Sequence, residues 1–239
     1  MSDSLIAGFL KIKNGLLRGD LYRCISNAEK FCDEIFCVDD YSFDGSQEWL
    51  KWYLGEDHVI CVPPDKHDFC AEMFWKQKLM DLLHKTSVFK WIYWFDSDEI
   101  LDRRGTEEIR DWCEKNKDNK QIKGLMFHYT QLWRNTSWAR TDSEFDNGSF
   151  VKLWAYEPTL SFDISPGTHH YQFPTQFINY LEKGIVKQAP WEVIHYGNVG
   201  PNLIFKALQY HGGRGGVYRH LYFNNATYRP VSIDQLPPG

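Results

Sequence analysis

The first hundred residues alternate short apolar runs with amphipathic helical stretches, and this alternation constrains the fold more than any other feature. Four strand-like runs lie near residues 5–12, 34–39, 58–62 and 91–96. Helical stretches separate them, from about Asp20 to Phe31, from a point after Asp44-Gly45-Ser46, and from about Asp68 to His84. Strands that alternate with helices build a parallel sheet covered by helices. We therefore expect an α/β fold with a mostly parallel central sheet flanked by helices.

The second half of the chain has a different residue pattern. A helix is expected from Thr106, and after residue 122 the sequence becomes strand-like and aromatic with long loops. A chain of 239 residues suits one domain. We expect that domain to span residues 1–223, comprising a first half over 1–102, a second over 103–200, and a helix with a mobile basic loop over 201–223. Residues 224–239 are expected to form an irregular tail.

Composition excludes several classes of protein. The 43% share of apolar residues and 25% share of charged residues are typical of a globular protein. The net charge of -5 gives no general attraction to nucleic acid or to an anionic membrane. No apolar run approaches the roughly 20 residues that span a bilayer, and the N-terminus lacks the features of a signal peptide. We expect a cytoplasmic protein without a transmembrane segment, whose six cysteines are buried thiols.

The most informative segment is WIYWFDSDEIL, residues 91–101, in which an aromatic strand ends in acids. Ligands of open α/β sheets gather at the carboxyl ends of the strands. Asp96 and Asp98 are expected to project on the same side of the extended chain, where they can clamp a divalent cation. Such an ion also binds the phosphates of a nucleotide. A solvated strand end or a helix cap would give the same acid-Ser-acid pattern.

Two further motifs stand in order before this segment. Lys13-Asn14-Gly15 follows the first strand, and Asp39-Asp40-Tyr41-Ser42-Phe43-Asp44-Gly45 closes the second. With Asp96-Ser97-Asp98, the chain resembles family 2 glycosyltransferases of the GT-A (Rossmann-like) fold, over roughly residues 5–102. It resembles in particular the lipopolysaccharide-core glucosyltransferase-like members.

The resemblance implies a function and a donor site. The chain would be a metal-dependent, inverting glycosyltransferase that moves a sugar from a nucleotide-diphosphate sugar, expected to be a UDP-sugar, to a hydroxyl of a glycan or another acceptor. Residues 1–102 would be its nucleotide-sugar half and 103–200 its acceptor half. The implied donor-binding residues are Lys13, Asn14, Asp39, Asp40, Lys76, Asp96 and Ser97. Asp39 or Asp40 would contact the uracil or ribose, and Lys76 would contact a phosphate; a solvated lysine on an amphipathic helix is the alternative for Lys76.

The resemblance also implies a metal site. Its ligands would be Asp96, which also faces the ribose, and Asp98. The third ligand would be His195, which a strand delivers immediately before a Gly-containing turn. The alternative is a hydrogen-bonded core histidine. Either Mn²⁺ or Mg²⁺ would serve as the cofactor, and mixed oxygen and imidazole ligation favours Mn²⁺.

The catalytic base departs from the family pattern. Similar enzymes carry Arg-Leu-Phe and then His-Glu, whereas this chain has Lys152-Leu153-Trp154 and then Thr168-His169-His170. An imidazole titrates near neutral pH, so His170 is the first candidate for the base. The other candidates are His169, Asp163, Asp146 and Glu144, and a retaining mechanism without a protein base also stays open.

Aromatic residues are dense in residues 127–173, and some are expected to line an acceptor groove. We favour Trp133 and Trp138 for surface roles, because they flank the polar segment 134–137. Three other functions remain open: a glycosyltransferase acting on modified DNA bases or a protein side chain, a catalytically inactive nucleotide-sugar binding module, and a nucleotidyltransferase. The acidic net charge does not favour a nucleic acid acceptor.

Overall fold

The structure is a computed structural model, and it describes residues 4–64, 72–86, 89–141, 148–164, 173–197, 199, 228–232 and 236. Within them the strands are β1 (Ile6–Ile12), β2 (Glu34–Asp39), β3 (Val59–Cys61), β4 (Trp91–Asp96), β5 (Glu99–Leu101), β6 (Gly124–Trp133), β7 (Asn135–Arg140), β8 (Ser149–Ala155), β9 (Val186–His195) and β10 (Tyr228–Pro230). The helices are α1 (Gly15–Arg18), α2 (Leu21–Ala28), α3 (Ser46–Leu54), α4 (Glu72–Thr86), α5 (Arg103–Asn116) and α6 (Gln176–Glu182), with a 3-10 turn at Glu56–His58.

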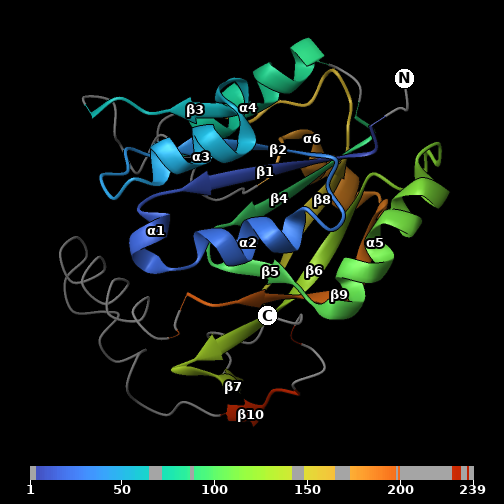
Figure 1. The fold of residues 1–239 in the computed structure, drawn as a ribbon. Coiled ribbons are helices and arrows are strands. Elements are labelled where there is room, and N and C mark those ends of the chain that lie inside the picture. Colours follow the sequence, from blue (N-terminus) through green and yellow to red (C-terminus); the bar gives the residue numbers. More distant parts are fainter. Residues whose placement is uncertain are drawn as a thin grey trace.

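One ten-stranded sheet forms the centre of the molecule (Figure 1). Strands β3, β2, β1 and β4 lie side by side and run parallel, in the order expected of a Rossmann-like half. Strands β8 and β6 continue the sheet in antiparallel pairing, and β9 runs parallel to β6. The α/β prediction, a single domain with a central sheet flanked by helices, is confirmed, with the antiparallel pairs concentrated in the second half of the chain.

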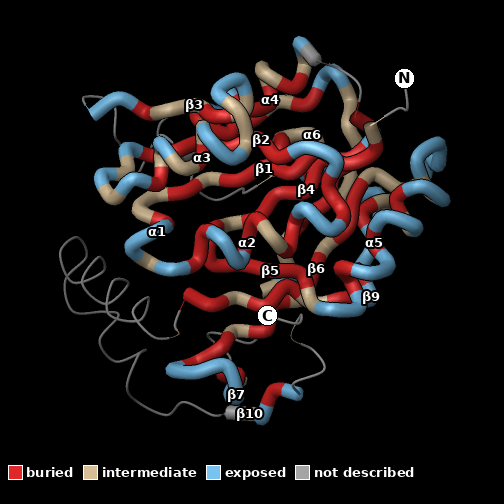
Figure 2. Tube along the Cα trace, in the orientation of Figure 1, coloured by how far each residue is buried: buried red, intermediate tan, exposed pale blue. Residues whose placement is uncertain are grey.

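Two apolar cores lie on the two faces of the sheet. Along β4, Trp91, Tyr93 and Phe95 enter one core, while Ile92 and Trp94 enter the other, because successive side chains of a strand point to opposite faces. The first core also receives the apolar faces of α2, α3 and α5, and the second receives those of α4 and α6. Figure 2 shows the buried strands between helices whose outer faces are exposed. Helices therefore cover both faces of the parallel strands.

Several element boundaries differ from the sequence prediction. Helix α5 begins at Arg103 instead of Thr106, because Oδ1 of Asp102 accepts a hydrogen bond from the backbone N–H of Gly105 and caps the helix three residues earlier. Helix α2 ends at Ala28 instead of Phe31. Residues 228–230 of the expected irregular tail form β10, which pairs with β7. The expected helix and basic loop over 201–223 lie outside the described residues.

In the part of the chain that the structure describes, no helix has the length and hydropathy to cross a membrane.

Candidate functional site

The carboxyl ends of β1, β2 and β4 meet at one edge of the sheet. Ile12, the last residue of β1, pairs with Asp39, the last residue of β2, and Lys11 pairs with Asp96, the last residue of β4. The turns that follow these strands therefore lie next to one another. The three sequence motifs, at residues 13–15, 39–45 and 96–98, come together as predicted.

Hydrogen bonds join the first two turns. The backbone N–H of Asn14 donates to Oγ of Ser42 at 2.7 Å, and Oδ1 of Asn14 accepts from the backbone N–H of Phe43 at 3.0 Å. Oδ2 of Asp44 accepts from the backbone N–H of Leu17 at 2.7 Å. Gly45, with φ of 89°, adopts the left-handed conformation that favours glycine. The motif residues thus hold the strand ends in a fixed arrangement.

Asp39 is a buried carboxylate at the β2 end of this edge. Its Oδ1 accepts from the backbone N–H of Ser42 at 2.9 Å, and among the described residues its Oδ2 has no hydrogen-bond partner. Burial is the largest influence on its pKa and raises it above the ordinary value, although the hydrogen bonds from Ser42 oppose the shift. A buried acceptor without a protein partner is suited to receive an N–H or O–H of a ligand.

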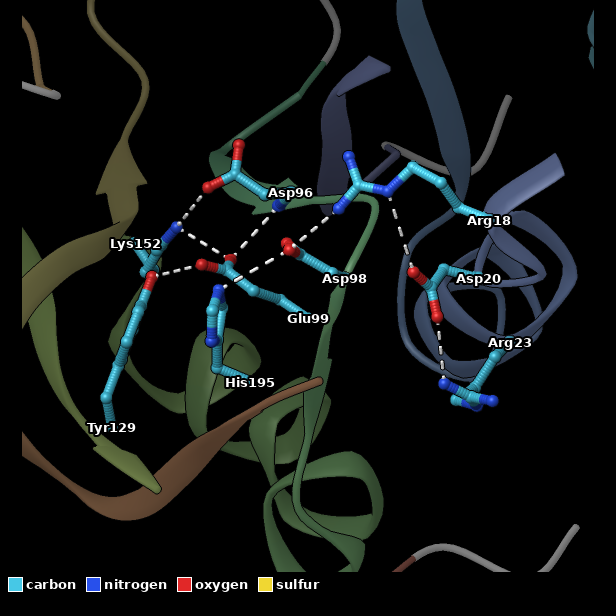
Figure 3. Close-up of polar contacts among 9 residues, drawn as sticks. All are labelled: Arg18, Asp20, Arg23, Asp96, Asp98, Glu99, Tyr129, Lys152 and His195. Carbon is cyan, nitrogen blue, oxygen red and sulfur yellow. Dashed lines mark hydrogen bonds and ion pairs between the residues drawn. The ribbon is translucent and has the colours of Figure 1, made fainter. Parts of the chain in front are cut away.

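Asp96 and Asp98 do not project side by side as predicted. Residues 97 and 98 form a turn between β4 and β5, so the chain is not extended there and the two carboxylates point to different partners (Figure 3). Asp96 faces Lys152, whose Nζ lies 3.4 Å from Oδ2. Asp98 faces Arg18 and His195. Glu99 follows this turn as the first residue of β5.

Lys152, Glu99 and Tyr129 form a buried polar network beneath Asp96. Nζ of Lys152 donates to Oε2 of Glu99 at 2.7 Å, and the hydroxyl of Tyr129 donates to Oε1. Oε2 of Glu99 also accepts from the backbone N–H of Asp96 at 3.0 Å. Burial raises the pKa of Glu99 to about 7, although Lys152 opposes the shift. For Lys152, burial lowers the pKa, but Glu99 and Asp96 outweigh it and leave the pKa above its ordinary value.

Asp96 remains the more acidic of the two neighbouring carboxyls. Its withdrawal from water raises its pKa, but the positive charges of Lys152 and Lys76 outweigh this and hold the pKa below its usual range. Asp96 is therefore a carboxylate at neutral pH. Its side chain is 37% exposed, so it can meet a ligand at the edge of the sheet.

Asp98 and His195 lie in contact. Strand β9 ends at His195, as predicted, and its antiparallel pairing with β5 brings His195 opposite Glu99. Nε2 of His195 lies 3.5 Å from Oδ2 of Asp98, and Nη2 of Arg18 lies 3.1 Å from the same oxygen. The ring of Tyr129 stacks on that of His195 with centroids 6.1 Å apart. An oxygen and an imidazole nitrogen thus converge from residues far apart in the sequence.

The donor atoms of this pair fit a divalent ion, since a carboxylate oxygen and an imidazole nitrogen suit Mn²⁺. Asp96 does not join them. Among the described residues, no group of three or more His, Cys, Asp and Glu side chains is arranged to hold a metal ion. The three-ligand site of Asp96, Asp98 and His195 stays a prediction.

Other predicted site residues lie in varied surroundings. Lys76 is only 1% exposed, with its Nζ 4.1 Å from the centroid of the Trp94 ring, so it is not a solvated lysine.

Trp138 is 46% exposed, as expected. The expectation for Trp133 is wrong: it is 2% exposed, because it lies at the end of β6 with the guanidinium of Arg140 over its ring at 4.5 Å. Asp163 is exposed. His169, His170, Asp146 and Glu144 lie outside the described residues.

Sequence reasoning assigned no role to Arg18, Lys152, Glu99 or Tyr129. Glu99 was visible beside the Asp96-Ser97-Asp98 motif, and Lys152 was visible only as a substitute for arginine in the strand that precedes the expected base. Nothing in the sequence indicated a role for Arg18 or Tyr129, because their proximity to the acids depends on where α1 and β6 lie in the fold.

No family model and no curated protein matches this chain. Among solved structures, residues 1–349 of Staphylococcus aureus TarS in complex with UDP match with 11% identity and a TM-score of 0.39, over 54% of this chain and 36% of that one. The chain thus spans about a third of the TarS structure that it matches. A Bacillus anthracis protein assigned as a glucose-1-phosphate thymidylyltransferase, in complex with sucrose, matches with 11% identity and a TM-score of 0.47, over 88% of this chain and 97% of that one. Because both TM-scores are low, these matches add nothing to the α/β fold that the strand order shows.

Proposed function

We propose that the chain is a glycosyltransferase that binds a nucleotide-diphosphate sugar at the shared edge of β1, β2 and β4. The observation that carries this proposal is the meeting of three ordered motifs at the carboxyl ends of neighbouring parallel strands. This is the edge at which open α/β sheets bind their ligands. The polar groups at its β2 end differ from those at its β4 end. A ligand made of a base, a diphosphate and a sugar needs such different contacts along its length.

The base and ribose would bind at the β2 end of the edge. There, the buried Oδ2 of Asp39 offers an acceptor that can receive the N–H of a uracil ring. The turn of residues 40–45 is held against Asn14 by hydrogen bonds, so the acceptor is fixed before a ligand arrives. Pre-organisation of this kind lowers the entropic cost of binding.

The diphosphate would bind at the β4 end. Asp98 and His195 would hold the divalent ion, Mn²⁺ or Mg²⁺, which supplies positive charge to the phosphates and to the departing diphosphate. The network of Lys152, Glu99 and Tyr129 fixes the backbone of Asp96, whose carboxylate stays ionised and exposed at the edge. The acceptor would approach from the second half of the chain, where Trp138 offers an exposed ring.

Product analysis tests the reaction class. The purified chain is incubated with UDP-glucose and related donors plus Mn²⁺, without acceptor, and the products are separated by anion exchange. Slow hydrolysis to UDP and free sugar, abolished by a chelator and by Asp98→Asn, supports sugar transfer. Formation of UTP and a sugar 1-phosphate on addition of pyrophosphate would identify a nucleotidyltransferase instead. Binding of the donor without either reaction would identify an inactive binding module.

A further inference from the structure

We propose that Arg18 is a phosphate-binding residue of the donor site and that Asp98 holds its guanidinium in place while no donor is bound. This inference rests on the proposed function, because it assigns a protein group to the donor's diphosphate. Arg18 lies outside the three sequence motifs, so the inference adds a positively charged residue to the predicted donor site.

The position of Arg18 supports this role. Arg18 is the last residue of α1, which begins directly after the Lys13-Asn14 turn. Its Nη2 lies 3.1 Å from Oδ2 of Asp98, and its Nε lies 4.0 Å from Oδ2 of Asp20. In Figure 3 the side chain extends from α1 toward the turn that holds Asp98. Arg18 therefore bridges the turn after β1 and the turn after β4, which border the same edge of the sheet.

The contact with Asp98 has an electrostatic reason. The side chain of Asp98 is 8% exposed, and a carboxylate withdrawn from water needs a nearby positive charge. Arg18 provides that charge in the absence of a ligand. A divalent ion on Asp98 would provide the same charge at the same oxygen, so the ion and the guanidinium would compete for it.

A guanidinium released from Asp98 would still lie at the donor edge, because α1 fixes its backbone there. Its side chain is 19% exposed, so it can reach a ligand at the surface of the site. The planar fork of N–H donors in arginine matches two phosphate oxygens at once. Lys76 is less suited to this task, since it is 1% exposed and its ammonium lies against the Trp94 ring.

Titration calorimetry with three probes tests the assignment: UDP in the presence of saturating Mn²⁺, uridine in the presence of saturating Mn²⁺, and Mn²⁺ alone. Arg18→Ala should bind UDP about tenfold or more weakly than the wild type, since a charge-assisted hydrogen bond to phosphate is lost. Its affinity for uridine should not change. Its affinity for Mn²⁺ alone should rise several-fold, because the ion no longer competes with the guanidinium. These opposite shifts are not expected from a purely structural role.

Two further variants complete the design. Arg23→Ala is the matched control, because Arg23 also pairs with Asp20, at 3.0 Å, and lies over the Tyr196 ring instead of Asp98; it should bind all three probes as the wild type does. Arg18→Lys should bind UDP with intermediate affinity, because it keeps the charge and loses the fork, and it replaces the alanine variant if thermal melting shows that the latter does not fold.

The possible failures are distinguishable. If the wild type binds neither UDP nor uridine, the proposed function itself is overturned. Equal UDP affinities of the wild type and Arg18→Ala, or an equal loss of UDP and uridine binding, overturn only the assignment of Arg18 to the phosphates. Unchanged or weaker Mn²⁺ binding by Arg18→Ala overturns the shared use of Asp98.

Discussion

Nζ of Lys152 lies 2.7 Å from Oε2 of Glu99, and the two side chains are 1% and 3% exposed. The pair joins β8 to the start of β5, and Glu99 in turn accepts a hydrogen bond from the backbone of Asp96. A buried ion pair therefore supports the residue that ends β4. Removing Lys152 would take the compensating positive charge away from Glu99 and from Asp96.

Lys152→Met should consequently destabilise the fold by about 3 kcal/mol or more, measured by urea denaturation. The double variant Lys152→Met with Glu99→Gln should recover part of this loss, because it removes the buried carboxyl that has lost its partner. Lys123→Met is the control, because its partner Glu157 is 25% exposed and the pair is worth only about 1 kcal/mol. Equal losses for Lys152→Met and Lys123→Met would contradict the role of the buried pair.

Asp33 gives a prediction about acid stability. Burial raises the pKa of its carboxyl, but hydrogen bonds from Arg110 and from the backbone N–H groups of Ile6 and Leu5 outweigh burial and hold the pKa below its ordinary value. A group with a depressed folded-state pKa stabilises the fold above its unfolded pKa, and this stability is lost as the pH falls through the folded pKa. Asp33→Asn should therefore be less stable than the wild type at pH 7, and the difference should shrink below about pH 4. Urea midpoints at several pH values measure it; a difference that is constant with pH would refute the assignment.

Unlike the carboxylate of Asp33, that of Asp39 is expected to lower the stability of the fold and to serve ligand binding. Its buried Oδ2 has no hydrogen-bond partner among the described residues, so the charge costs the fold stability. Asp39→Asn keeps an oxygen for the backbone N–H of Ser42 and removes the charge. We expect unchanged or higher thermal stability together with a loss of UDP affinity of about tenfold. Retained UDP affinity in a stable Asp39→Asn protein would remove Asp39 from the donor site.

The two tryptophans of the predicted acceptor groove should now behave differently. Trp133 is buried, so Trp133→Ala should destabilise the fold by about 3 kcal/mol or more. Trp138 is 46% exposed, so Trp138→Ala should leave stability nearly unchanged and, if its ring stacks on the acceptor, raise the acceptor KM with little effect on donor affinity. An acceptor KM that does not respond to Trp138→Ala would place the acceptor elsewhere.

The strand and helix pattern of the first half could be predicted because it depends on local periodicity. Strands β1, β2 and β4 lie within a residue of their expected bounds, and the motifs at their ends meet because parallel strands align their carboxyl ends. The convergence of His195 on Asp98 could also be expected once the family resemblance was seen, and the pairing of β9 with β5 provides it.

The remainder depends on contacts between distant parts of the chain. The turn at residues 97–98 separates Asp96 from Asp98, and nothing in an acid-Ser-acid pattern distinguishes a turn from an extended strand. Trp133 appeared suited to the surface because polar residues follow it, yet Arg140 returns along β7 to cover its ring. The burial of Lys152 likewise depends on Glu99 and Tyr129, which come from two other strands.

The central claim is that the shared edge of β1, β2 and β4 binds a nucleotide-diphosphate sugar, and a thermal-shift panel tests it most directly. UDP-, GDP-, CMP- and TDP-sugars are added with and without Mn²⁺ to the wild type and to Asp98→Asn. A ligand at about 100 times its Kd stabilises the folded state by about 2.7 kcal/mol. This corresponds to a rise in Tm of roughly 5–10 °C for a domain of this size. We predict such a rise for a UDP-sugar with Mn²⁺ in the wild type and a much smaller one in Asp98→Asn; no rise with any donor, or equal rises in the two proteins, would contradict the account.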